Sequence, residues 1–192
     1  MKRKYSKKHM QKVILADDLK ESVGFLLKLR LPWLAAGLIG GFGASILISK
    51  YEAVLASDVR LAFFLPVIVY LSDAVGTQTE TIYVRNLADK KGYFHTYLVK
   101  ESVLGVLFGI VFGFLTFGFT YLWFKDVPLS STVAIAMAGC VALAPIVALV
   151  TAKIFQTEHQ DPAVGAGPFK TIFQDVISIL IYFSVASTIL YI

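Results

Sequence analysis

Five long apolar segments constrain this chain more than any other feature of its sequence. They are residues 31–48, 61–85, 103–124, 133–152 and 169–192. A helix needs about 20 mostly apolar residues to cross the ~30 Å hydrocarbon core of a bilayer, and all five segments are close to that length. Apolar residues make up 57% of the chain and charged residues only 16%, which excludes an ordinary soluble domain. We therefore predict an all-α, polytopic membrane domain over residues 31–192.

Lysine and arginine are distributed unequally between the two sides of such a membrane domain. Fifteen of the 18 fall in residues 1–30 and in the second and fourth loops, with Lys170 counted in the fourth loop. Only three fall in the first and third loops. Because basic loops stay in the cytoplasm, we predict a plasma-membrane protein with a cytoplasmic N-terminus and an extracellular C-terminus.

The basic segment 1–30 contains a candidate amphipathic helix over residues 11–30. Leu15, Leu19, Val23 and Leu26 recur at helical spacing with charged residues between them. Such a helix lies on the cytoplasmic face of the membrane or packs under the transmembrane helices. Beside a first membrane segment, the basic run indicates a membrane anchor, and we expect no nucleic-acid partner.

Two carboxylates inside apolar segments are the leading functional candidates. Asp73 lies in the second segment and Asp175 in the fifth. At 1.5 Å per residue they lie about 12 Å and about 9 Å from the cytoplasmic edge, so they share one layer. Acids at that depth indicate an ion or proton pathway. The alternative is a carboxylate that pairs with a neighbouring basic group and fixes helix packing.

Helical spacing places further polar residues beside these acids. Asp73, Thr77 and Glu80 follow an i, i+4, i+7 pattern, and Thr171 and Asp175 follow an i, i+4 pattern. The two polar faces describe half the wall of a cation path. Hard divalent cations such as Mg²⁺ take oxygen ligands of this kind.

A second cation site is predicted at the cytoplasmic mouth. Residue counting places Glu80 and Asp161 there, where carboxylates concentrate cations. The alternative is that Glu80 pairs with Arg85 or Lys170 and holds the loops together. We expect no zinc or copper site, since no cysteine pair or histidine cluster has ligand spacing.

Three stretches of sequence carry a resemblance to a known family. They are LRLPWL (29–34), LAFFLPVIVYLSDAVGTQTETIYVRNLA (61–88) and DPAVGAGPFKTIFQDVISILIYFSVA (161–186). In these stretches the chain is similar to the membrane domain of the MgtE magnesium transporters and channels. The resemblance implies five helices, a homodimer, Mg²⁺ as the transported and bound ion, and a pore lined by the second and fifth helices. It places the family's pore aspartate at Asp175 and residues near the pore entrance at Asp161, Pro162, Gly167 and Thr171.

The chain departs from the family pattern in two ways. The family usually reads Gly-Gly-Asn-Ala-Gly-Thr-Gln where this sequence has SDAVGTQ (72–78), so an acid is gained at Asp73 and an asparagine is lost. This leaves selectivity among Mg²⁺, Mn²⁺, Ca²⁺ and Co²⁺ open. The resemblance covers the membrane domain alone, so we expect a protein without the family's N-terminal helical domain and paired CBS domains. We expect gating by other means, with residues 11–30 as the local candidate.

The leading hypothesis is a homodimeric divalent-cation channel or transporter in contact with membrane lipid. A two-fold dimer would duplicate Asp73 and Asp175 into a layer of four carboxylates. One alternative is a carrier coupled to Na⁺ or H⁺, with Asp73 and Glu80 supplying the second site. Another is a membrane enzyme or assembly subunit without flux. Because the membrane acids lack a partnering His, Ser or Cys at their depth, we predict no enzyme and no catalytic residues.

Overall fold

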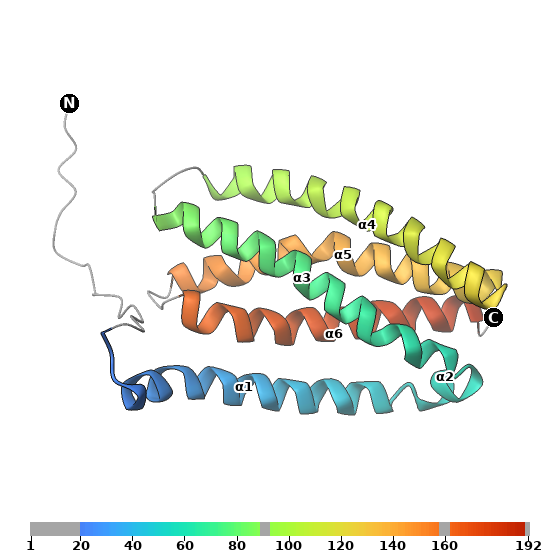
Figure 1. Cartoon of the computed structure of the whole chain (residues 1–192), viewed down its shortest axis with the longest axis horizontal. Helices are drawn as coiled ribbons and strands as arrows, with labels where there is room; N and C mark the ends of the chain where they lie inside the picture. The colour runs from blue at the N-terminus through green and yellow to red at the C-terminus, as the bar shows by residue number, and fades with distance from the viewer. Residues whose placement is uncertain (1–19, 89–92, 158–161, 191–192) are drawn as a thin grey trace.

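The computed structural model describes residues 20–88, 93–157 and 162–190, and these form six helices (Figure 1). The helices are α1 (Val23–Ser49), α2 (Glu52–Ser57), α3 (Arg60–Ala88), α4 (Phe94–Phe124), α5 (Val127–Thr157) and α6 (Pro162–Leu190). Every helix except α2 is long and apolar enough to cross a membrane. The prediction of an all-α chain with five membrane segments is confirmed.

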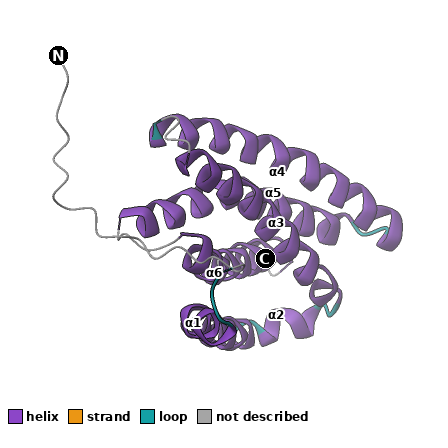
Figure 2. Ribbon diagram, turned by 60° about the vertical axis from the view of Figure 1, so that its left-hand side comes forward, coloured by secondary structure: helices purple, strands orange, loops and turns teal. Residues whose placement is uncertain are grey.

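The five long helices form a bundle with α5 at its centre. Helix α5 packs against α3, α4 and α6, and it carries much of the buried core through small residues such as Ala136, Ala144 and Ala148. Helices α4 and α1 lie on opposite outer sides of the bundle in both views, and α1 packs on α6 (Figures 1 and 2). Helix α3 packs on both α5 and α6. The two helices that carry the candidate polar residues, α3 and α6, are therefore neighbours.

Glycines at four-residue spacing join α4 to α5. A Cβ atom at Gly109 would lie 2.5 Å from the carbonyl oxygen of Ala138, and Gly105 and Gly113 are also too close to α5 for an unstrained side chain. Small residues of this kind let two membrane helices approach closely. A Cβ at Gly118 would meet nothing within 4 Å, so this glycine lies outside the seam.

The N-terminal part of the described chain differs from the expected separate amphipathic helix over 11–30. Residues 11–19 lie outside the described residues. Residues 23–30 belong to α1 and continue without a break into the first membrane segment. The Ser22 side chain caps this helix by accepting a hydrogen bond from the Phe25 N–H at 3.3 Å. The helix begins before the apolar segment because the i to i−4 backbone hydrogen bonds do not depend on apolar side chains.

One end of the bundle is held together by charged residues outside the apolar segments. The Arg60 guanidinium contacts Asp58 at 2.6 Å and Asp126 at 2.8 Å. Asp126 also caps α5, since its Oδ1 accepts a hydrogen bond from the Leu129 N–H at 3.0 Å. The hydrogen bond from Arg60 lowers the pKa of Asp58 below its ordinary value of 3.8. This cluster connects the α2–α3 turn to the α4–α5 turn.

Candidate functional site: a polar pocket between α3 and α6

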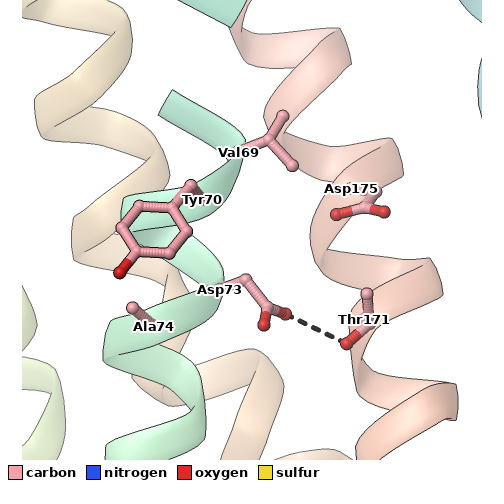
Figure 3. Close-up of a pocket in the computed structure, with 6 residues that line it drawn as sticks. All are labelled: Val69, Tyr70, Asp73, Ala74, Thr171 and Asp175. Atoms are coloured by element: carbon pink, nitrogen blue, oxygen red, sulfur yellow. Dashed lines mark hydrogen bonds between the residues drawn. The ribbon is translucent and has the colours of Figure 1, made fainter. Parts of the chain in front are cut away.

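A pocket of about 280 Å³ lies between the facing sides of α3 and α6 (Figure 3). It is lined by Val69, Tyr70, Asp73 and Ala74 from α3 and by Thr171 and Asp175 from α6. Residue counting placed the two acids in one layer, and the structure does bring them to the same pocket. Thr171 lines the pocket with them, one helical turn before Asp175.

Within the pocket, Asp73 is bound through both of its carboxylate oxygens. Its Oδ1 accepts a salt bridge from Lys170 Nζ at 2.8 Å and a hydrogen bond from Thr171 Oγ1 at 3.1 Å, the latter drawn in Figure 3. Its Oδ2 accepts a longer hydrogen bond from Thr77 Oγ1 at 3.4 Å. The charge of Asp73 is therefore compensated within the protein.

Lys170 is the functional candidate that sequence reasoning missed. It was counted as a loop residue, but it lies inside α6 and only 1% of it is exposed. The stem passes over Gly76, where a Cβ would already be 3.6 Å from Lys170 Cδ. Its position within the apolar segment 169–192 was the available signal. Removing it from the loop count leaves fourteen basic residues against three, so the predicted orientation is the same.

Asp175 has a different environment from Asp73. Its Oδ1 is buried, and no described residue donates a hydrogen bond to that atom. The structure records no ion pair between Asp175 and a basic side chain within the described ranges, whereas it does for Asp73. Figure 3 shows the Asp175 carboxylate on the pocket side of α6, opposite Asp73 and Tyr70. Of the two acids in the layer, Asp175 is the one with free coordination capacity.

Behind the pocket, buried polar side chains hold α3, α5 and α6 in register. The Ser72 and Ser178 hydroxyl oxygens are 3.1 Å apart, and Gln174 Nε2 donates to Ser178 Oγ at 3.3 Å. The Cys140 thiol on α5 donates to the Ser178 carbonyl oxygen at 3.7 Å. These groups bond to one another, so they fix the packing of the three helices.

The polar face of α3 continues beyond the pocket. A second groove of about 270 Å³ is lined by Thr77, Gln78, Thr81 and Ile82. Thr77, Gln78 and Thr81 are all exposed on the outside of the bundle. Asp73, Thr77 and Thr81 therefore form a continuous polar track along one side of α3.

The residues predicted at the cytoplasmic mouth are only partly described. Glu80 is 9% exposed, and the structure gives its carboxylate no hydrogen bond or ion pair with any described residue, Arg85 and Lys170 included. Asp161 lies outside the described residues, so the predicted Glu80–Asp161 site stays a prediction. A Cβ at Gly167 would meet nothing within 4 Å, and this position borders open space.

A single chain gathers few metal ligands in its described part. No group of three or more His, Cys, Asp or Glu residues there could hold a metal ion. A bare divalent cation would need more ligands than Asp175 and its neighbours supply. The pocket suits a cation that keeps most of its water, or one that a second copy of the chain helps to bind.

Comparison with known proteins gives one consistent result. A family model described as MgtE, divalent cation transporter, matches residues 65–185. The chain is similar to the magnesium transporter MgtE of Enterococcus faecalis, with 32% identity over 161 residues that cover 82% of this chain and 36% of the relative. It is 30% identical to the magnesium transporter MgtE of Thermus thermophilus over 84% of this chain and 36% of that protein. The chain thus spans about a third of the length of these relatives.

Proposed function

The chain belongs to the MgtE family of divalent cation transporters, and on that premise we propose that it moves a divalent cation, specifically Mg²⁺, across a membrane. The path runs along the polar faces of α3 and α6. The observation that carries the proposal is the carboxylate of Asp175, which lies beside a pocket with one oxygen buried and unpaired. A charged group in that state at membrane depth is costly unless a cation or proton visits it.

The size of the pocket supports a hydrated ion as its occupant. Mg²⁺ binds six oxygens in an octahedron and gives up its waters reluctantly. Six waters at about 30 Å³ each occupy roughly 180 Å³. The pocket volume of about 280 Å³ accommodates that group. Asp175 would accept hydrogen bonds from the coordinated waters, with the Thr171 hydroxyl beside it on α6 and Asp73 across the pocket on α3.

The exposed polar track supports a homodimer as the functional unit. Thr77, Gln78 and Thr81 face outward from the bundle inside a segment long enough to cross the membrane. Polar side chains are unfavourable against lipid, and they are accommodated where a second protein surface or a water-filled path covers them. A second copy related by a two-fold axis would cover both tracks and enclose one path between them.

The remaining predicted ligands extend the proposed path toward the cytoplasm. Glu80 lies two helical turns along α3 from Asp73, and Asp161 precedes the first residue of α6. We place Gly167 beside the same path, since its neighbourhood is open. In this proposal the N-terminus is cytoplasmic and the C-terminus extracellular, as the distribution of basic residues predicts.

Reconstituted protein tests the function directly. Purified chain in liposomes that contain a Mg²⁺-sensitive dye should admit Mg²⁺ down its gradient, at a rate that imposed Na⁺ or proton gradients leave unchanged. Flux that requires either gradient would instead establish a coupled carrier. Folded protein that moves neither Mg²⁺ nor Mn²⁺ under any gradient would contradict the transport proposal. Cysteine cross-linking at Gln78, on the exposed track, should give a covalent dimer if the tracks face each other.

A further inference from the structure

We infer that Lys170 is a tethered cation that sets the net charge of the transport pocket. The inference rests on the proposed function and adds a residue that determines how strongly the pocket holds a divalent cation. It starts from an arrangement that neither acid alone predicts: a nearly fully buried ammonium group that is bonded to one pocket carboxylate and not to the other.

The bonding of Lys170 shows that its ammonium is fixed in place. Its three N–H groups have three acceptors, which are Asp73 Oδ1 at 2.8 Å, Thr77 Oγ1 at 2.7 Å and the Asp73 carbonyl oxygen at 3.2 Å. An ammonium group has no further donor. Breaking the ion pair would leave the Lys170 charge buried and uncompensated, which is strongly unfavourable. Lys170 therefore acts as a permanent counter-ion and not as a group that each passing ion displaces.

The charge balance of the pocket follows from this bonding. Asp73 and Asp175 contribute two negative charges and Lys170 contributes one positive charge, so each chain presents one net negative charge. Without Lys170 the same pocket would carry two. A conducting site must attract its ion and also release it. Lys170 lowers the attraction of an acid-rich pocket and thereby favours release.

A purely structural role is the competing interpretation. The salt bridge and its hydrogen bonds also tie α6 to α3, so loss of Lys170 could act on folding alone. The two roles predict different results for the ion affinity of protein that has folded. A structural tie affects the amount of folded protein, whereas a counter-ion affects the affinity of each folded molecule.

A charge-balance cycle separates these roles, with saturable Mn²⁺ flux into liposomes as the measurement. Lys170→Met keeps an apolar stem and removes the charge, so it should raise the apparent Mn²⁺ affinity more than tenfold. Asp73→Asn leaves Lys170 uncompensated and should lower the affinity more than tenfold. The double variant Asp73→Asn/Lys170→Met restores one net negative charge. Its apparent Mn²⁺ affinity should therefore be within about threefold of the wild-type value. A unit charge about 8 Å from a divalent ion is strong enough for such shifts, even at an effective dielectric near 20.

Control variants show whether a negative result contradicts the role of Lys170 or the proposed transport function. Lys153→Met removes a lysine that bonds to Gln156 on α5, away from the pocket, and should leave the affinity unchanged. Equal affinities across the four members of the cycle would overturn the inference while leaving transport intact. If Lys170→Met does not fold, the comparison of Asp73→Asn with the double variant still decides, because only a counter-ion role predicts recovery there. Folded wild-type protein without saturable flux would instead refute the proposed function, and the inference with it.

Discussion

The α4–α5 pair and the α3–α6 pair are held together by different physical means. Between α4 and α5 the contact depends on shape, since glycines on α4 let the α5 backbone approach to distances that no side chain would allow. Between α3 and α6 it depends on polar bonds, chiefly the Asp73–Lys170 salt bridge and the Ser72–Ser178 contact. The first interface brings glycines directly against the α5 backbone, whereas the second leaves a pocket beside its bonds.

This difference shows how a small membrane chain can separate scaffold from site. Inside lipid, helices gain little from burying apolar surface, so close packing of small residues provides the association. The α4–α5 pair uses that mechanism and needs no charge. The α3–α6 pair carries the charges, and it compensates Asp73 internally, whereas Asp175 forms no ion pair with any residue that the structure describes. Substitutions in the two pairs should therefore affect different measurements.

The largest effect is expected from Asp175→Asn. Asparagine keeps the volume of the side chain and removes its charge, so folding should be preserved while Mg²⁺ flux per folded molecule falls about 100-fold, or roughly 3 kcal/mol. Liposome flux normalised to folded protein checks this. Glu52→Gln, which neutralises an exposed acid on α2, is the matched control and should keep full flux. Normal flux together with a reduced folded yield would assign Asp175 to the scaffold.

The next effect concerns the α4–α5 interface. Gly109→Ala places a Cβ 2.5 Å from the Ala138 carbonyl oxygen, so the two backbones must separate. We expect a loss of about 2 kcal/mol in the free energy of unfolding, within the usual cost of overpacking. Gly118→Ala, where a Cβ meets nothing, has the same helix-propensity gain without the clash. The comparison uses unfolding in mixed detergent micelles. Equal stability of the two variants would mean that the seam can relax without cost.

A smaller effect is expected where α1 packs on α6. A Cβ at Gly40 would lie 2.5 Å from Ile172 Cγ1, a side-chain atom that can move more easily than a backbone carbonyl. Relative to Gly41→Ala, whose Cβ meets nothing within 4 Å, Gly40→Ala should be less stable by about 1 kcal/mol. Thermal unfolding followed by size-exclusion chromatography measures the difference. A Gly40→Ala chain as stable as Gly41→Ala would show that α1 is loosely held.

The smallest effect concerns the charged cluster at the end of the bundle. The folded-state pKa of Asp58 lies below its ordinary value of 3.8 because Arg60 bonds to the carboxylate. The resulting stability is fully present above pH 3.8 and is lost as the pH falls through the lower folded-state value. The free energy of unfolding of wild type should exceed that of Asp58→Asn by about 0.5 kcal/mol at pH 7. That difference should shrink when unfolding is measured at successively lower pH below 3.8. A difference that persists unchanged would mean that the charge of Asp58 is not its source.

Parts of the site could be predicted because they depend on position along a single helix. Depth in the membrane follows from residue count, so Asp73 and Asp175 could be placed in one layer before any contact was known. The four-residue spacing of Gly105, Gly109 and Gly113 likewise places them on one face of α4, whereas Gly118, five residues after Gly113, breaks that spacing and faces open space. The partner of each acid could not be predicted by counting, because it depends on contacts between two helices.

The sequence by itself determined the five long apolar helices and the all-α class. It also predicted that the two acids lie together, because hydrocarbon thickness and helical rise relate sequence position to depth. Only the tertiary structure decided which acid is compensated. The aliphatic stem of Lys170 passes over Gly76, and its ammonium group forms an ion pair with Asp73, although Lys170 lies on the same helix as Asp175. That choice depends on the rotation of α6 against α3 and on side-chain direction across two segments about 100 residues apart. Neither the helix rotation nor the side-chain direction can be read from residue spacing. The ion pair that sets the charge of the pocket is therefore known only from the packed helices.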